Sequence, residues 1–261
     1  MTDYKKLFSI QGKRAVVIGG GGGIGGAIAE GFAALGAKTA IVGRSLERLK
    51  KQADAIKSNC GAAVECFAAD CSDDESVAKL YADVCSAFGG VDILVNSQGV
   101  NKKFSALEHP VAEWDEMYDA NVKSVMLTCK YFARYMKEQR CGRIINVSSI
   151  GAILSKQSDI SVCYSSTKGA VNAYSVNLAA GLGEYGITVN CIGPIMTETE
   201  MMKPIFEKNP ELLSGTVARV PIGRIGKPED CAGVAIFLAS DAAEFITGQI
   251  IYPDGGLSTL Q

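Results

Sequence analysis

Residues 15–26 read AVVIGGGGGIGG, and this stretch decides the fold. Its first four residues are apolar and mostly β-branched, which is typical of a buried strand. The five glycines Gly19–Gly23 follow directly, and a helical pattern begins at Ile24. Glycine lets the main chain turn sharply and approach a ligand closely, and the free N–H groups at a helix start favour a phosphate. The order of strand, glycine loop and helix therefore predicts a loop that binds a phosphate.

Short β-branched runs alternate with helical patterns along the rest of the chain. This alternation predicts a single α/β domain over residues 1–261, a Rossmann-type doubly wound parallel sheet of about seven strands with helices on both faces. The expected strands cover residues 15–18, 39–42, 64–67, 93–95, 143–147, 188–192 and 249–252. The expected helices cover residues 24–35, 45–58, 73–88, 112–138, 162–183 and 228–240, and the fourth contains a break near Asn121.

Composition excludes several classes of protein. The formal net charge is −2 without a basic cluster, so no nucleic-acid partner is expected. No apolar run approaches the roughly 20 residues of a membrane helix, and the start of the chain lacks the apolar segment of a signal peptide, so we expect a cytoplasmic protein without a membrane partner. The nine cysteines include no C-x-x-C pair and there is one histidine, so no metal site is predicted.

Tyr164 and Lys168 are four residues apart, so they share one face of the predicted helix. A free tyrosine has a pKa near 10, and a nearby ammonium group is expected to lower it towards the range that suits acid–base catalysis. This pair predicts a proton donor to the alkoxide that forms from a carbonyl. The spacing alone is weak, because it also occurs on ordinary exposed helices.

Ser148 and Ser149 follow the fifth predicted strand and would point into the ligand crevice of a doubly wound sheet. Either hydroxyl could bind a carbonyl oxygen at that position.

The chain resembles the short-chain dehydrogenase/reductase family along almost its whole length. The resemblance rests on the loop Gly19-x-x-x-Gly23-Ile24-Gly25, on residues 94–99, 190–194, 224–230 and 254–256, and on Tyr164 with Lys168. Ile18, Ser97, Gln98 and Ile195 depart from the family pattern. Ile18 replaces a threonine that ties the loop to the neighbouring strand, so a less rigid loop is expected.

The resemblance implies a reaction between a nicotinamide cofactor and a carbonyl or alcohol, with Asn121, Ser149, Tyr164 and Lys168 as catalytic residues. It places the catalytic serine second in its pair, so Ser148 is the fallback, and it indicates a small insertion within residues 155–161. It also implies a homotetramer. The expected cofactor contacts are Gly19, Gly23, Ile24, Gly25, Arg44, Asp70, Cys71, Asn96, Gly99, Tyr164, Lys168, Pro194, Thr197 and Thr199.

The second predicted strand ends at Gly43-Arg44, where an acidic residue would bind the ribose 2′-hydroxyl of NAD. Arg44 suits a 2′-phosphate instead, so NADP(H) is favoured over NAD(H). By resemblance, Asp70 and Cys71 would hold the adenine ring.

The small-molecule substrate is the least constrained part. Residues 7–13 and 101–103 resemble gluconate 5-dehydrogenases, which favours a keto-sugar acid or polyol, with Lys102 or Lys103 on a carboxylate and Ser149 and Met196 as further substrate contacts. Residues 194–221 fit neither periodicity and are expected to form an irregular lid. A 3-oxoacyl thioester reductase, a hydroxysteroid dehydrogenase and, more remotely, a non-catalytic NADP sensor are the alternatives.

Overall fold

The computed structural model of the chain describes residues 2–154 and 160–259. Seven strands form one parallel sheet in the order β3-β2-β1-β4-β5-β6-β7. The strands are β1 (Arg14–Ile18), β2 (Lys38–Gly43), β3 (Glu65–Ala68), β4 (Ile93–Asn96), β5 (Gly142–Val147), β6 (Ile187–Ile192) and β7 (Ile250–Ile251). Each lies where the sequence predicts a strand, so the doubly wound Rossmann-type fold is confirmed.

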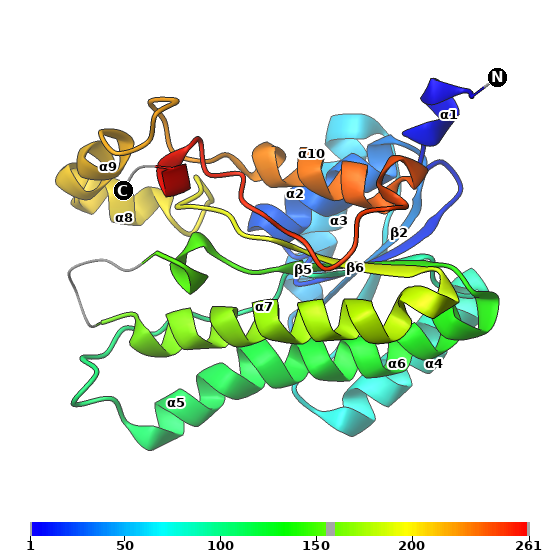
Figure 1. Cartoon of the computed structure of the whole chain (residues 1–261), viewed down its shortest axis with the longest axis horizontal. Coiled ribbons are helices and arrows are strands. Elements are labelled where there is room, and N and C mark those ends of the chain that lie inside the picture. Colours follow the sequence, from blue (N-terminus) through cyan, green and yellow to red (C-terminus); the bar gives the residue numbers. More distant parts are fainter. Residues whose placement is uncertain (1, 155–159, 260–261) are drawn as a thin grey trace.

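Helices cover both faces of this sheet (Figure 1). One face packs against α2 (Gly23–Ala34), α3 (Leu46–Cys60) and α10 (Pro228–Ala239). The other packs against α4 (Asp74–Phe88), α6 (Ser124–Gln139) and α7 (Val162–Leu182). A four-residue helix, α1 (Tyr4–Leu7), precedes the sheet. Among the described residues, no helix is long and apolar enough to cross a bilayer.

Local sequence sets the helix ends. The Ser45 hydroxyl accepts the N–H of Arg48 at the start of α3, and the Asp73 carboxylate caps α4 in the same way. Both helices end at a glycine in the left-handed region, Gly61 with φ 74° and Gly89 with φ 71°. These signals explain why both helices lie close to their predicted ranges.

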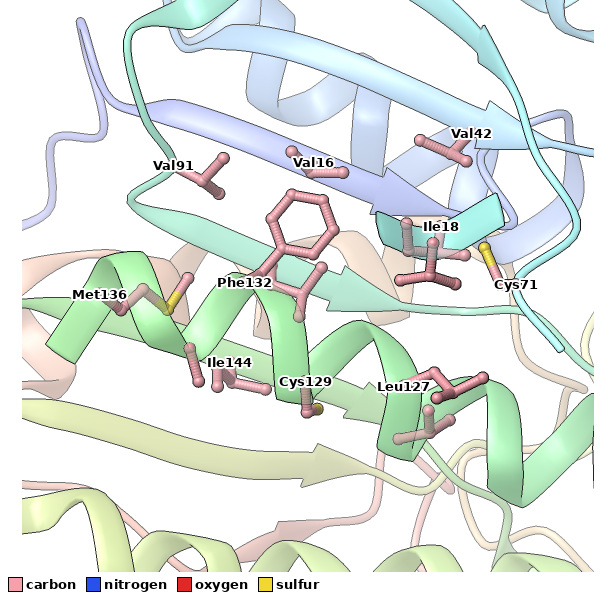
Figure 2. Packing of buried hydrophobic residues seen from close by; sticks show 14 of the residues in the cluster. Val16, Ile18, Val42, Cys71, Val91, Leu127, Cys129, Phe132, Met136 and Ile144 are labelled. Atoms are coloured by element: carbon pink, nitrogen blue, oxygen red, sulfur yellow. The ribbon is translucent and has the colours of Figure 1, made fainter. Parts of the chain in front are cut away.

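Alternate residues of β1 point to opposite faces of the sheet and pack into two separate hydrophobic cores. Val16 and Ile18 pack with α4 and α6, whereas Ala15 and Val17 pack with α2 and α10. Phe132 of α6 is fully buried, and its ring points from the helix towards Val16 (Figure 2). The two cores fix the central strands, and with them the loops at their carboxyl ends.

The strand order reverses beside β1, because the chain continues to β2 on one side while β4 lies on the other. The loops after β1 and β4 diverge at such a point and leave a crevice for a ligand. They remain in contact at their bases, where the Ser97 amide donates to the Ile18 carbonyl at 2.9 Å. The crevice is therefore bordered by the glycine loop and by residues 97–100.

The expectation that residues 194–221 are irregular was wrong. They contain α8 (Lys203–Lys208) and α9 (Pro210–Val217), and a proline stands in the first turn of each. Proline is favoured there, because its φ suits a helix and the N–H that it lacks needs no partner. Both helices are short, so neither repeats a helical pattern long enough to be recognised from the sequence.

Candidate active site

The glycine loop is tightly packed at its base and open at its tip. A Cβ atom on Gly19, which has φ +77°, would lie 2.7 Å from the main chain of Ser97 and Gln98. A Cβ atom on Gly25 would lie 2.4 Å from the Gly19 carbonyl oxygen. Main-chain bonds from Gly19 and Gly20 to the Val42 carbonyl anchor the loop. These bonds tie the loop to β2 without the threonine that the family has at position 18.

The start of α2 suits a phosphate. Its N-cap is Gly22, with φ 138° and no side chain to bond the first-turn N–H groups. Those groups remain available to an anion, and the positive end of the helix dipole favours one. Thr199, an expected cofactor contact, lies beside this turn, because its methyl carbon would be 3.5 Å from a Cβ atom on Gly23. The loop therefore fits the pyrophosphate of a dinucleotide.

A cationic region adjoins the loop at the end of β2. Arg44 is exposed and makes no ion pair within the described part of the chain. Sequence reasoning missed Arg48, whose guanidinium nitrogen lies 4.0 Å from the position of a Cβ atom on Gly22. The signal was available, because Arg44 and Arg48 are four residues apart across a helix start. Both side chains fit a phosphorylated ribose.

The expected adenine-binding pair follows β3. Asp70 accepts hydrogen bonds from the amide and hydroxyl of Ser72, and these bonds lower the pKa of its carboxyl group, with a smaller contribution from the charge of Arg44. Cys71 is buried, and burial raises the pKa of its thiol to about 12. Its thiol belongs to the core, so any adenine contact at this position falls to the main chain.

The loop after β4 brings two expected residues to different places. The Asn96 side chain is buried and bonds Asn146 of β5 at 2.8 Å and Thr128 of α6 at 2.7 Å. It therefore cross-links the fold, and only its main chain can reach a cofactor. Gly99 borders the crevice, because a Cβ atom there would lie 3.5 Å from the Lys168 ammonium nitrogen.

Tyr164 and Lys168 lie on the first turns of α7, and the Lys168 nitrogen is 5.8 Å from the Tyr164 ring centroid. Lys168 is buried, donates to the Val147 carbonyl at 2.8 Å, and has its pKa lowered by burial to about 8. Burial raises the pKa of Tyr164, and a hydrogen bond with the Ser149 hydroxyl offsets part of this effect. The net pKa of Tyr164 is therefore raised and not lowered as expected, because desolvation outweighs any stabilisation of the tyrosinate by Lys168.

The two serines after β5 have different surroundings. Ser148 is 2% exposed, and its hydroxyl donates to the Lys168 carbonyl at 3.2 Å. Ser149 is more exposed, and its hydroxyl accepts the Gly151 amide at 3.1 Å and bonds Tyr164. Ser149 is thus the serine that faces the tyrosine. The insertion expected within residues 155–161 falls mainly outside the described residues.

Asn121 lies in a π-helical turn, Asp119–Lys123, between α5 (Val111–Tyr118) and α6. The predicted break in this helix is therefore present. Its buried amide bonds the amide and carbonyl of Val100 at 2.7 and 2.9 Å and the Thr167 hydroxyl at 3.0 Å. Asn121 thus joins the loop after β4 to α7.

The segment after β6 carries the remaining expected residues. Pro194 is buried, and its carbonyl accepts the Ile150 amide at 2.9 Å, close to Ser149 in the chain. The Thr197 hydroxyl donates to the Ile195 carbonyl at 2.8 Å and is buried, so its side chain is already engaged within the fold. The Met196 sulfur accepts from Thr216 of α9 at 3.8 Å. Met196 therefore links the strand end to the helices of the expected lid.

The two lysines expected to bind substrate differ. Lys102 forms ion pairs with both Glu113 and Glu116 of α5, whereas Lys103 is exposed and has no ionic partner among the described residues. Within residues 2–154 and 160–259, no cluster of three His, Cys, Asp or Glu side chains could hold a metal ion.

The geometry defines a dinucleotide crevice with a tyrosine, a serine and a lysine at its centre, and comparison with known proteins agrees. Residues 19–258 match the family model described as enoyl-(acyl carrier protein) reductase. The chain belongs to the short-chain dehydrogenase/reductase family, whose members are oxidoreductases that act on CH–OH or carbonyl groups.

Three similar proteins illustrate the range within this family. Galactitol 2-dehydrogenase (L-tagatose-forming) of Cereibacter sphaeroides is 35% identical over 255 residues, which cover 97% of this chain and 98% of that protein. A 3-oxoacyl-[acyl-carrier-protein] reductase of Aquifex aeolicus is 33% identical and covers 95% of this chain and 98% of that protein. The crystal structure of a gluconate 5-dehydrogenase from Burkholderia cenocepacia with NADP and tartrate has a TM-score of 0.92, 30% identity and coverage of 99% of this chain and 100% of that chain.

Proposed function

We propose that this enzyme interconverts a ketone and a secondary alcohol on a keto-sugar acid or polyol, with NADP(H) as cofactor. The observation that carries the proposal is the position of Tyr164 on the first turns of α7, beside the buried Lys168 and with Ser149 acting on its hydroxyl, at the crevice that the glycine loop borders. Bound NADPH supplies the hydride in the reductive direction.

The raised pKa of Tyr164 keeps its hydroxyl protonated at neutral pH, so it can donate a proton to the alkoxide that forms from the carbonyl. The Ser149 hydroxyl hydrogen-bonds the carbonyl oxygen and orients it towards Tyr164. The Lys168 ammonium, one helical turn away, stabilises the tyrosinate that remains. Asn121 positions this arrangement, because it ties Thr167 of α7 to Val100.

NADP(H) is preferred in this proposal because no carboxylate ends β2 and two guanidinium groups lie there instead. We expect Arg44→Ser to raise KM for NADPH roughly 10- to 100-fold, since it removes a charge-assisted hydrogen bond to the 2′-phosphate. KM for NADH should change little. A wild-type preference for NADH would contradict the assignment.

Residues 194–221 are proposed to form a lid, with α8 and α9 above the crevice at the carboxyl ends of the strands (Figure 1). Met196 packs against Thr216 of α9, so the lid reaches the segment that follows β6. Closure over bound substrate would exclude water from Tyr164.

The proposal is tested by NADPH oxidation with matched panels of keto-sugars, 3-oxoacyl thioesters and ketosteroids. We expect turnover of keto-sugars and a loss of at least about 100-fold in kcat for Tyr164→Phe, because the proton donor is removed. Tyr185→Phe is the matched control, since Tyr185 follows the opposite end of α7 and stacks with Lys137. Turnover of thioesters or steroids alone would establish one of those alternatives, and equal inertness of wild type and Tyr164→Phe on every substrate would favour a non-catalytic NADP sensor.

A further inference from the structure

The segment between β4 and α6 carries an excess of negative charge. Residues 101–120 include five carboxylates and two lysines, a formal charge of −3. One of these carboxylates, on Asp119, pairs with Lys123 at 3.4 Å. The remaining four carboxylates still outnumber the two lysines, so the segment keeps a net negative charge. A substrate that approaches past this segment therefore meets a negative potential.

Lys102 offsets only part of that negative potential. Its ammonium group hydrogen-bonds the carboxylates of both Glu113 and Glu116, and these bonds raise the pKa of Lys102. Its main-chain amide also contacts the Met117 sulfur at 3.5 Å, so both ends of the residue are held on α5. We call Lys102, Glu113 and Glu116 the Lys102 triad. The triad has two negative charges and one positive charge, so its net charge is −1.

The triad lies at the mouth of the active site. Gly99 borders the Lys168 ammonium, and Val100 is hydrogen-bonded to Asn121. Lys102 follows Gly99 by three residues, a span of at most about 11 Å for an extended chain. The segment that leads into α5 lies at the same end of the molecule as the start of α7 and helices α8 and α9 (Figure 1).

We propose that the Lys102 triad makes this enzyme select a neutral polyol or ketose over a sugar acid. The inference rests on the proposed function and narrows its substrate class. A substrate carboxylate would have to displace Glu113 or Glu116 from Lys102, or remain within the field of the uncompensated charge. A neutral hydroxyl group neither has to displace a glutamate nor is repelled by the negative charge. The exposed carboxylates at the mouth can also accept hydrogen bonds from substrate hydroxyl groups.

The test compares a ketose with the keto-acid of the same chain length, under NADPH and at low ionic strength. Wild type should have the higher kcat/KM for the ketose. Glu113→Gln combined with Glu116→Gln changes the charge of the triad by two units and frees Lys102. At about 10 Å and a water-like dielectric constant, this change should shift the ratio of the two kcat/KM values towards the keto-acid by about fourfold.

The dependence of this ratio on salt concentration is a second measurement. A purely structural effect of the two substitutions would not depend on salt. Because the Debye length falls to about 3 Å at 1 M salt, the difference between the double variant and wild type should largely vanish there. Asp83→Asn is the matched control: Asp83 pairs with Lys79 on the exposed face of α4, and its loss should leave the ratio unchanged.

Three results would overturn the inference. One is a wild-type preference for the keto-acid, and another is an unchanged ratio in the double variant. The third is a loss of more than tenfold in keto-acid turnover, but not in ketose turnover, for Lys103→Met. Such a loss would mean that Lys103 binds the substrate carboxylate directly. Absence of turnover with both substrates would instead contradict the proposed function.

Discussion

Lys168 is a basic group buried inside the fold, and we expect Lys168→Met to change how stability depends on pH. Burial lowers the pKa of Lys168 from 10.5 to about 8. Between these two values the unfolded chain still holds the proton that the folded chain has released. The free energy of unfolding of wild type therefore contains a contribution that rises with pH over this window.

The size of this contribution follows from the two pKa values. Each pKa unit corresponds to about 1.4 kcal/mol, so the full change from below pH 8 to above pH 10.5 is about 3 kcal/mol. Between pH 7 and pH 9 the rise should be about 1.4 kcal/mol. The raised pKa of Tyr164 acts in the opposite direction, but only above pH 10, where the unfolded tyrosine loses its proton first.

Urea unfolding of wild type and Lys168→Met at several pH values between 6 and 9 measures the effect. The difference between the two proteins cancels every other titrating group to first order. The free energy of unfolding of wild type minus that of the variant should be about 1.4 kcal/mol larger at pH 9 than at pH 6. Parallel pH profiles for the two proteins would show that Lys168 keeps an ordinary pKa, and would refute burial as the dominant effect on it.

Four further substitutions test the core, the serine pair and the loop. Phe132→Ala should lower the free energy of unfolding by about 3–5 kcal/mol in urea titrations, because a fully buried ring leaves a cavity; a loss below about 1 kcal/mol would contradict this packing. Ser149→Ala should reduce kcat at least about 100-fold, whereas Ser148→Ala should cost mainly about 1 kcal/mol of stability, and the reverse pattern would move the catalytic role to Ser148. Gly25→Ala places a carbon 2.4 Å from the Gly19 carbonyl oxygen and should weaken NADPH binding, measured by cofactor fluorescence; an unchanged Kd would show that the loop does not hold the cofactor.

Much of the active site could be predicted because it depends on local patterns. The four-residue spacing puts Tyr164 and Lys168 on one face of α7 whatever surrounds that helix. Strand ends could also be placed, because parallel strands buried on both faces read as apolar runs bounded by polar residues. The irregularity at Asn121 was predicted as well, and it is a π-helical turn within the helix.

Properties that arise from distant parts of the chain could not be predicted in this way. The pKa of Tyr164 is raised by desolvation in the folded chain, and this effect outweighs that of Lys168, which is the neighbour that the spacing identifies. Likewise, Lys102 looks like a free cation in the sequence, and only packing of its loop on α5 pairs it with Glu113 and Glu116.

The sequence by itself determined the sheet, the glycine loop and the shared helix face of Tyr164 and Lys168, because each depends on residues that are neighbours along the chain or on the repeat of one helix or strand. Only the tertiary structure decided that Ser149 faces Tyr164 while Ser148 is bound to the backbone of α7, and that Asn96 lies inside the fold. The physical reason is that desolvation and hydrogen-bond partners are set by residues far apart in sequence, and these decide which polar groups remain free to meet a substrate.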